Sequence, residues 1–401
     1  MLEKLKDLWF RVLYRLISAF AFNRITVTGP TSDGKGPVLY VGLHRNGAID
    51  GAVYRRVAPK AKMTLSSQLR RKAWMRAIFD GIEIVRPQDM EKDGARVSND
   101  ESFAKAAAFL ANDGELLFFP EGTSDLGPRH LKFRTGVAKL IRTTLQQIPS
   151  LKVVPLAAHY EDAPTWQSNV DIRVGEAIEF TGTPSVPEIM SKLTPALEEI
   201  GLDCETAQER RTVEALAYAA TLGNKDIPYS KALKALADAH ETFGTKLALA
   251  RTLGGPLQHQ GIPLTPVKHA WAYGVALCVL FPFQLFVLGL NYAPYMVMEH
   301  LVDRLADAPN VRSLWRALTG LALLSFWGCV VMTPLLLVLD WRAVPLYWLG
   351  TVVQIKTLYR TKKVFVTVAN CVADFSDPKR MGPSALLELH TELTDYVRSK
   401  L

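Results

Sequence analysis

The stretch Leu39-Tyr-Val-Gly-Leu-His-Arg-Asn-Gly-Ala-Ile-Asp50 decides the fold that we expect for this chain. It opens as a short apolar run rich in Val and Leu, which is typical of a buried strand. The strand is expected to end at His44, and a helix is expected to begin near Asp50. A histidine at a strand end can act as a general base when a nearby carboxylate orients its imidazole. The alternative interpretation is an ordinary solvated loop histidine.

A second stretch, Glu115 to Ser124, is another apolar strand that ends in a polar turn containing Glu121, Gly122 and Thr123. Residues 98–112 before it have helical character with a polar, acidic start. Strand, helix and strand at this spacing predict a parallel arrangement. Ligands in such sheets bind outside the carboxyl ends of the strands. The expected fold class is therefore α/β, with a mostly parallel central sheet flanked by helices.

The pair of motifs, His44 to Asp50 with Phe119-Pro-Glu-Gly-Thr-Ser124, resembles the PlsC-type glycerolipid acyltransferase superfamily. That superfamily includes glycerol-3-phosphate and 1-acylglycerol-3-phosphate acyltransferases. The order His-x-Asn-x-x-x-Asp looks most like its fungal glycerol-3-phosphate/dihydroxyacetone-phosphate branch and the bacterial relatives of that branch. The common pattern has four residues between His and Asp, and this chain has five. The resemblance covers roughly residues 35–180.

The resemblance implies transfer of a fatty acyl group from a thioester, acyl-CoA or acyl-carrier protein, to a glycerol-phosphate hydroxyl. It implies no metal and no cofactor beyond this co-substrate. His44 would take the hydroxyl proton and Asp50 would orient it, with backbone N–H groups near Gly122 as oxyanion donors. The substrate-binding residues it implies are Asn46, Arg86, Glu121, Gly122, Thr123, Lys132 and Arg134. Arg86 would hold the acceptor phosphate; a surface salt bridge for Arg86, and solvated cations at Lys132 and Arg134, are the alternatives.

The charge balance of the chain points to an anionic partner. The net charge is +8 and the sequence pI is near 9.2. Basic excess of this kind suits nucleic acid or an anionic membrane. No nucleic-acid motif is present, so we expect membrane lipids and no nucleic acid as partners. The four cysteines show neither a disulfide framework nor metal-ligand spacing.

The expected organisation has five parts. Residues 1–23 form an amphipathic helix, either at the lipid interface or packed on the protein's own core. Residues 24–183 form the acyltransferase domain, with helices expected over 52–58 and 69–79. Residues 184–262 form a helical region without an assigned role, with helices expected over 187–199, 206–222 and 230–253. Residues 263–365 form a membrane-embedded helical hairpin, and residues 366–401 form a tail that ends in an amphipathic helix.

The hairpin is expected because Ala270 to Met298 carries no formal charge and Ala317 to Leu339 is similar. Each is long enough to cross a hydrocarbon core, which takes ~20 residues. Pro282 and Pro334 lie inside them and are expected to kink them. The basic segment that follows favours a membrane protein whose catalytic domain is cytoplasmic. A re-entrant pair in one leaflet and a buried pair in a soluble protein are the alternatives.

Two other functions compete with the acyltransferase prediction. One is a lipid hydrolase that uses His44 with a serine, although no Gly-x-Ser-x-Gly motif is present. The other is a non-catalytic lipid-binding membrane scaffold that keeps the acyltransferase fold. An acyl-transfer assay separates the three.

Overall fold

The computed structural model describes residues 2–30, 36–66, 73–84, 99–265, 269–377 and 382–401. The chain divides into two compact units. Unit 1 consists of Met1–Ser18, Ile25–His159 and Asp171–Asp203, and unit 2 of Ala19–Arg24, Tyr160–Val170 and Cys204–Leu401.

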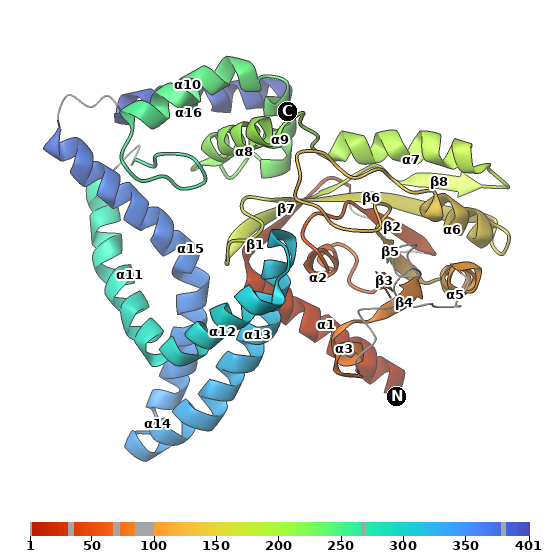
Figure 1. The fold of residues 1–401 in the computed structure, drawn as a ribbon, viewed down its shortest axis with the longest axis horizontal. Helices are drawn as coiled ribbons and strands as arrows, with labels where there is room; N and C mark the ends of the chain where they lie inside the picture. Colours follow the sequence, from red (N-terminus) through yellow and green to blue (C-terminus); the bar gives the residue numbers. More distant parts are fainter. Residues whose placement is uncertain (1, 31–35, 67–72, 85–98, 266–268, 378–381) are drawn as a thin grey trace. The chain divides into compact units, whose positions relative to one another are not determined.

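The described part of the chain forms an eight-stranded sheet, most of which belongs to unit 1 (Figure 1). Its path runs β1-β7-β6-β2-β5-β3-β4, and β8 pairs with β6 off this path. Strand β2 pairs in parallel with both β5 and β6, while the β6–β8 pair is antiparallel. The strands are β1 Phe22–Thr28, β2 Val38–Gly42, β3 Lys62–Ser66, β4 Gly81–Ile84, β5 Glu115–Phe118, β6 Ser150–Tyr160, β7 Ser168–Val174 and β8 Ile178–Thr181. The predicted α/β class with a mostly parallel sheet is confirmed.

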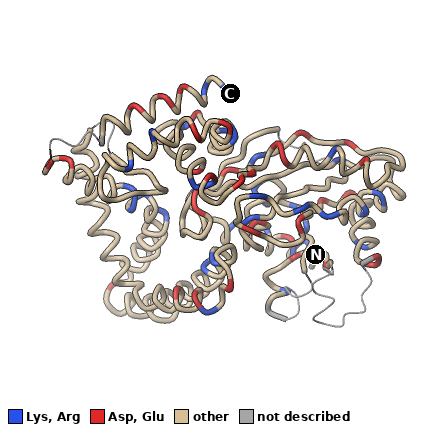
Figure 2. Tube along the Cα trace, turned by 45° about the horizontal axis from the view of Figure 1, so that its top comes forward, with Lys and Arg blue, Asp and Glu red and all other residues tan. Residues whose placement is uncertain are grey.

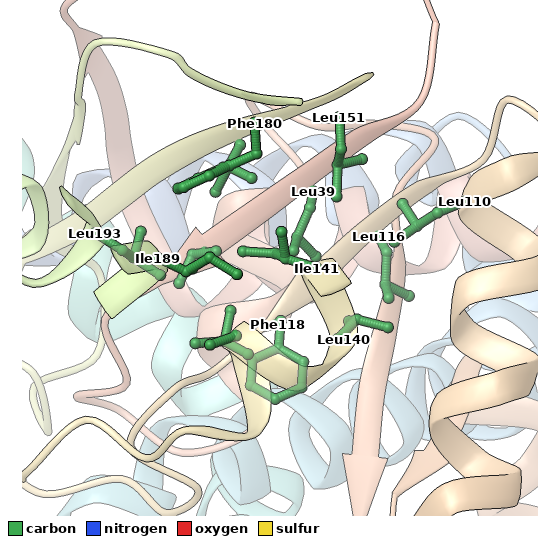
Figure 3. Packing of buried hydrophobic residues seen from close by; sticks show 14 of the residues in the cluster. Leu39, Leu110, Leu116, Phe118, Leu140, Ile141, Leu151, Phe180, Ile189 and Leu193 are labelled. Atoms are coloured by element: carbon green, nitrogen blue, oxygen red, sulfur yellow. The ribbon is translucent and has the colours of Figure 1, made fainter. Parts of the chain in front are cut away.

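Strand β2 lies in the interior of the sheet, and its register places Leu39 beside Leu116 and Val153. All five of its residues are buried, which explains its continuous apolar sequence. Leu39 and Val41 point into an apolar core formed with α5 Asn99–Ala111, α6 Gly136–Leu145 and α7 Val186–Ile200 (Figure 3). Alternation along the strand turns Gly42 to the other face, against Tyr54 of α2 Ile49–Tyr54.

Helix α1, Leu2–Ala21, has one face packed on the protein and one exposed apolar face, so it has features of both arrangements that the sequence allowed. One face packs on unit 1: the Tyr14 hydroxyl accepts a hydrogen bond from Asp80 N, and Trp9 Nε1 donates to the carbonyl of Ala77. Phe10, Tyr14 and Ile17 are buried. A second stripe remains exposed, and it consists of Leu5, Leu8, Trp9, Val12 and Leu16. The helix is therefore anchored to the protein and still presents an apolar surface.

Three local expectations for the first 253 residues need correction. Strand β3 was not predicted, because Lys62-Met-Thr-Leu-Ser66 is short and half polar and becomes a strand by pairing with β4 and β5. The helix expected over 52–58 runs instead over Ile49–Tyr54. The single helix expected over 230–253 is two, α9 Tyr229–Ala237 and α10 His240–Leu253. The helix expected over 69–79 is present in its described part as α3, Ala73–Ile78.

Four helices of unit 2 pack together as a bundle. Helix α8, Ala207–Thr221, contacts α9, α10 and α16, Gly382–Lys400. Ion pairs join the bundle at its surface, for example between Arg398 and Asp226 at 3.0 Å. The expected amphipathic C-terminal helix is thus part of this bundle, with Leu389 and Leu393 buried in it.

The remaining helices of unit 2 include long apolar segments, and Figure 2 shows stretches of the trace without charged residues. They are α11 Ala270–Leu290, α12 Tyr292–Leu305, α13 Arg312–Phe326, a π-helical turn Trp327–Met332, α14 Thr333–Leu339 and α15 Ala343–Ser376. Among the described helices, Ala270–Leu290 and Pro309–Leu339 are long and apolar enough to cross a membrane. Most of their residues are not buried by the protein, which suggests association with a membrane.

The helix expected over 270–298 breaks at Asn291, which separates α11 from α12. The Asn291 side chain is buried, and its Nδ2 donates to the carbonyl of Val287 and to Thr351 Oγ1, each at 3.1 Å. Its Oδ1 accepts a hydrogen bond from the Tyr347 hydroxyl at 2.7 Å. Helix α11 packs along α15, which is the most extensive helix–helix contact in the unit. Buried polar bonds thus fix the break inside an apolar segment.

Candidate active site

His44 and Asp50 meet at the carboxyl end of β2. The Nδ1 atom of His44 lies 3.0 Å from Oδ2 of Asp50. Asp50 is the second residue of α2 and is fully buried. Its Oδ2 also accepts hydrogen bonds from the backbone N–H groups of Arg45 (2.8 Å) and Asn46 (2.9 Å). Gly47 takes a positive φ of 61°, which suits glycine and lets the chain turn back between the two residues.

This arrangement selects one tautomer of the imidazole. A carboxylate oxygen only accepts hydrogen bonds, so Nδ1 of His44 carries a proton, and in the neutral ring Nε2 then carries the free lone pair. The ring stacks on Phe119, with centroids 4.1 Å apart, and retains 15% exposure. A neutral histidine that is held in one tautomer and remains reachable is equipped to accept a proton from a bound hydroxyl group.

A cavity of about 360 Å³ lies at the carboxyl ends of the parallel strands, and His44 lines it. Much of its wall is apolar and comes from β3, β4, α5 and the end of β5, namely Met63, Leu65, Ile84, Phe103, Phe118 and Phe119. Another part is cationic, with Arg134 and Lys139 beside the first residues of α6. A helix N-terminus flanked by two cations favours anionic groups. The cavity therefore combines a base, an apolar surface and a positively charged surface.

Glu121 is a buried brace in this site, with 2% exposure. Its Oε1 accepts the backbone N–H of His44 at 2.8 Å, and its Oε2 accepts that of Leu131 at 3.2 Å. Both oxygens are thus occupied by backbone donors from two segments. The sequence predicted that Glu121 shapes the acceptor pocket. In this geometry Glu121 would do so indirectly, because its carboxylate holds the strand end that carries His44.

Gly122 takes a positive φ of 75° and lines the cavity. Its N–H, which the sequence suggested as an oxyanion donor, donates to the carbonyl of Phe119 at 3.3 Å within the turn. A Cβ at Gly122 would lie 3.3 Å from Nε of Arg134. The turn therefore places Arg134 directly beside Gly122.

The other predicted substrate-binding residues fall into three groups. Arg134 lines both the main cavity and a second hollow of about 520 Å³ that Thr123 and Lys132 also line. Asn46 is fully buried and lines neither. Arg86 lies outside the described residues. The structure thus brings His44, Gly122 and Arg134 to one cavity.

Three further residues support the site and were not predicted from the sequence. The guanidinium of Arg45 is buried and donates to the carbonyls of Gly127 (2.6 Å) and Arg129 (3.2 Å). Nδ1 of His130 lies 3.8 Å from Oε1 of Glu121. The Tyr54 hydroxyl donates to the carbonyl of Leu43 at 2.7 Å, and burial, with a smaller contribution from the Asp50 charge, raises its pKa well above the usual value. Arg45 stands inside the first motif, whereas His130 carries no local signal.

The described residues contain no group of three or more His, Cys, Asp or Glu side chains that could hold a metal ion.

Comparison with known proteins finds a family match over part of the chain. Residues 24–159, which include His44, Asp50 and Glu121, match the family described as Acyltransferase. The match supports an acyltransferase. No curated protein matches the chain.

Among solved structures, the chain is similar to the 1-acyl-sn-glycerophosphate acyltransferase PlsC from Thermotoga maritima. The two share 16% sequence identity over 49% of this chain and 80% of that one, with a TM-score of 0.37. A likeness at this distance carries no argument about function.

Proposed function

We propose that the protein is a membrane-bound O-acyltransferase that moves a fatty acyl group from a thioester to a glycerol-phosphate hydroxyl in phospholipid biosynthesis. The donor would be acyl-CoA or acyl-carrier protein, and the acceptor glycerol-3-phosphate or 1-acylglycerol-3-phosphate. The observation that carries the proposal is His44, held by Asp50 at 3.0 Å and lining a cavity that is partly apolar and partly cationic. The family match over residues 24–159 supports the same reaction class.

The reaction needs one proton acceptor and no covalent acyl-enzyme. The acceptor hydroxyl gives its proton to Nε2 of His44 while its oxygen bonds to the thioester carbonyl carbon. The carbonyl then re-forms, the carbon–sulfur bond breaks, and the thiolate takes the proton back from His44. Asp50 stabilises the imidazolium between the two transfers without taking the proton itself. The buried acceptor oxygen of Asp50 is already in place for this task.

The two surfaces of the cavity suit the two substrates. The apolar wall, which includes Phe103 and Phe118, accommodates methylene groups next to the thioester. Arg134, Lys139 and the α6 N-terminus provide an anchor for phosphate oxygens. The five-residue spacing between His44 and Asp50, which resembles the fungal branch, makes glycerol-3-phosphate the first acceptor to test.

Membrane lipids complete the proposal. The exposed stripe of α1 is flanked by the exposed cations Lys4, Lys6, Arg11 and Arg15, a combination that suits an anionic lipid surface. Apolar helices of unit 2 would lie in the bilayer. The exposed cations Arg360 and Lys362 of α15 favour a cytoplasmic location for the segment that carries them. Nucleic acid plays no part in this proposal.

The experiment is a radiolabelled acyl-transfer assay on the purified full chain. Each acceptor is combined with acyl-CoA and with acyl-carrier protein, and the wild type is compared with His44→Ala. We expect transfer by the wild type and a loss of at least about 100-fold in the variant. His390→Ala serves as the matched histidine control, because His390 lies on α16 in unit 2 and its ring bonds to the carbonyl of Ala219. Release of free fatty acid instead would identify a hydrolase, and lipid binding without turnover would identify a scaffold.

A further inference from the structure

Unit 2 contains a groove that the proposed reaction does not use. It has a volume of about 510 Å³, and all its lining residues belong to unit 2. We name it the α11–α15 groove and define it by its apolar lining residues Phe281, Leu285, Leu288, Met298, Leu358 and Phe365. We propose that this groove is a binding site for one single-chain anionic lipid, of the lysophospholipid class, separate from the cavity at His44.

The apolar lining selects an acyl chain. Three of the six defining residues lie on α11, which is long and apolar enough to cross a membrane. A hydrocarbon chain can therefore enter the groove from a surrounding lipid phase without crossing water. Ligand sites of this kind occupy roughly 300–1,000 Å³. A volume in the lower part of that range suits one chain better than the two chains of an ordinary phospholipid.

The charged residues of the groove select an anionic headgroup. Two charged side chains line it, Lys362 and Glu299. Glu299 already pairs with Arg316, with contacts of 2.7 and 3.1 Å between its carboxylate oxygens and the guanidinium nitrogens. Lys362 is exposed and forms no ion pair with any described residue. The groove therefore presents one uncompensated positive charge at its edge, where a phosphate can bind it.

A buried amide beside the groove favours a headgroup that carries a hydroxyl. Gln284 lines the groove from α11, and its Nε2 donates to the carbonyl of Gln354 (3.1 Å) and to Thr357 Oγ1 (2.7 Å). Because a carbonyl can only accept, these bonds fix which end of the amide is nitrogen. The Oε1 atom is buried and has no hydrogen-bond partner among the described residues. A buried polar atom without a partner requires an explanation, and the hydroxyl of a glycerol headgroup would supply the missing donor.

Bulk lipid alone does not account for these features. Loosely bound lipid explains exposed apolar side chains such as Val338 and Phe375. Loosely bound lipid does not require a recessed groove, a buried amide oxygen without a hydrogen-bond donor, or a cation without an ion-pair partner beside the groove. The combination of the three commits the groove to an amphiphile with one chain, a hydroxyl group and a negative charge.

Photolabelling of the full chain tests the proposal. The probe is lysophosphatidate with a diazirine in its acyl chain, added in neutral detergent without any acyl donor, so that no transfer takes place. Labelled residues are mapped by mass spectrometry. We expect saturable labelling of peptides that contain Phe281 to Leu288 and Phe365. Unlabelled lysophosphatidate should compete with it, and uncharged monoacylglycerol should compete much less.

Two variants and a control make the result decisive. Lys362→Glu should lower labelling of the groove at least about fivefold, the equivalent of about 1 kcal/mol for one cation near a lipid headgroup. Leu285→Trp should lower it by filling the groove, whereas Leu337→Trp on α14, which is exposed and outside the groove, should not. Labelling of the cavity at His44 should be unchanged in all three variants.

Four outcomes would overturn the proposal. They are labelling spread evenly over the exposed faces of α14 and α15, equal competition by monoacylglycerol, no effect of Lys362→Glu, and crosslinks at the groove between two copies of the chain. Because the measurement is labelling of unit 2, it is independent of whether the wild type transfers acyl groups. A failure of the proposed function therefore leaves this test intact.

Discussion

Oδ2 of Asp50 serves both the base and the loop that carries it: it lies 3.0 Å from Nδ1 of His44 and accepts the N–H groups of Arg45 and Asn46. Charge-assisted bonds of this kind are stronger than neutral ones. One buried carboxylate thus sets the tautomer of the imidazole and closes the turn after β2. The positive φ of Gly47 lets the five intervening residues turn the chain back so that Asp50 reaches the imidazole.

Asp50→Asn should therefore remove activity without removing the fold. Because Oδ2 meets Nδ1 of His44 and both backbone N–H groups, an asparagine that keeps its amide oxygen there still holds the turn and the ring, but it lacks the negative charge that stabilises the imidazolium. We expect kcat to fall by about 10²–10⁴ with a smaller change in KM. Steady-state acyl transfer measures both constants, and circular dichroism checks the fold.

Asp100→Asn is the matched control, because Asp100 also lines the cavity but lies on the exposed start of α5. It removes the same charge without touching the imidazole. We expect its kcat to stay within about threefold of the wild type, because an exposed charge is strongly screened. Equal losses in the two variants would mean that any negative charge on the cavity wall has the same effect and that the contact between Asp50 and His44 has no special role.

Glu121→Gln tests whether Glu121 holds the backbone of the site or contacts the substrate. Each carboxylate oxygen of Glu121 accepts a backbone N–H, one from His44 and one from Leu131. In the glutamine variant one of these donors meets an NH₂ group, which leaves it without an acceptor at a cost of about 1–3 kcal/mol. We expect a lower melting temperature and a lower kcat, with KM for the acceptor little changed.

Glu179→Gln, on the exposed face of β8, provides the comparison for this experiment. It should leave both the melting temperature and kcat close to wild type, because surface substitutions usually have small effects. A raised KM for the acceptor in Glu121→Gln at unchanged stability would contradict the brace and would favour direct contact with the substrate.

The parts of the fold that the sequence predicted are those encoded locally. Strand β2 and residues 116–118 of β5 are continuous apolar runs, because both faces of a parallel sheet are covered. Strand β3 could not be predicted, since its residues become a strand only through pairing with β4 and β5. The same holds for His130: its position beside Glu121 depends on the loop that Arg45 holds through the carbonyls of Gly127 and Arg129.

Arg134 is expected to bind substrate phosphate, and Gly122 offers a second way to test it. Arg134→Gln removes the charge from the wall of the cavity and should raise KM for the phosphate-bearing substrates about tenfold, with kcat less affected. Gly122→Ala should act in the same direction, because a Cβ would lie 3.3 Å from Nε of Arg134 at a backbone φ of 75°.

Lys132→Gln separates the two hollows near Arg134. Lys132 lines the hollow of about 520 Å³ and not the cavity at His44. If phosphate binds in the cavity, Lys132→Gln should change KM much less than Arg134→Gln does. The reverse order, measured on the same purified proteins, would move the phosphate site to the second hollow.

His259 predicts how the stability of unit 2 depends on pH. Its ring is 1% exposed, neither nitrogen has a hydrogen-bond partner among the described residues, and it packs between Tyr218 and Tyr359. Burial, with a smaller contribution from the charges of Lys363 and Lys362, lowers its pKa to about 3. The folded protein therefore holds this histidine neutral, whereas the unfolded chain binds a proton below about pH 6.5.

Because the pKa of His259 is lower in the folded protein than in the unfolded chain, its neutral ring contributes fully to the free energy of unfolding above about pH 6.5. That contribution is lost as the pH falls from about 6.5 towards 3. Between neutral pH and pH 5 the loss amounts to about 2 kcal/mol. His259→Phe keeps the aromatic contacts and removes the titration, so its stability should fall less over the same interval. The exposed His300→Gln is the control, and thermal unfolding in detergent at several pH values gives the slopes. Identical slopes for wild type and His259→Phe would show that another group controls the acid sensitivity of the protein.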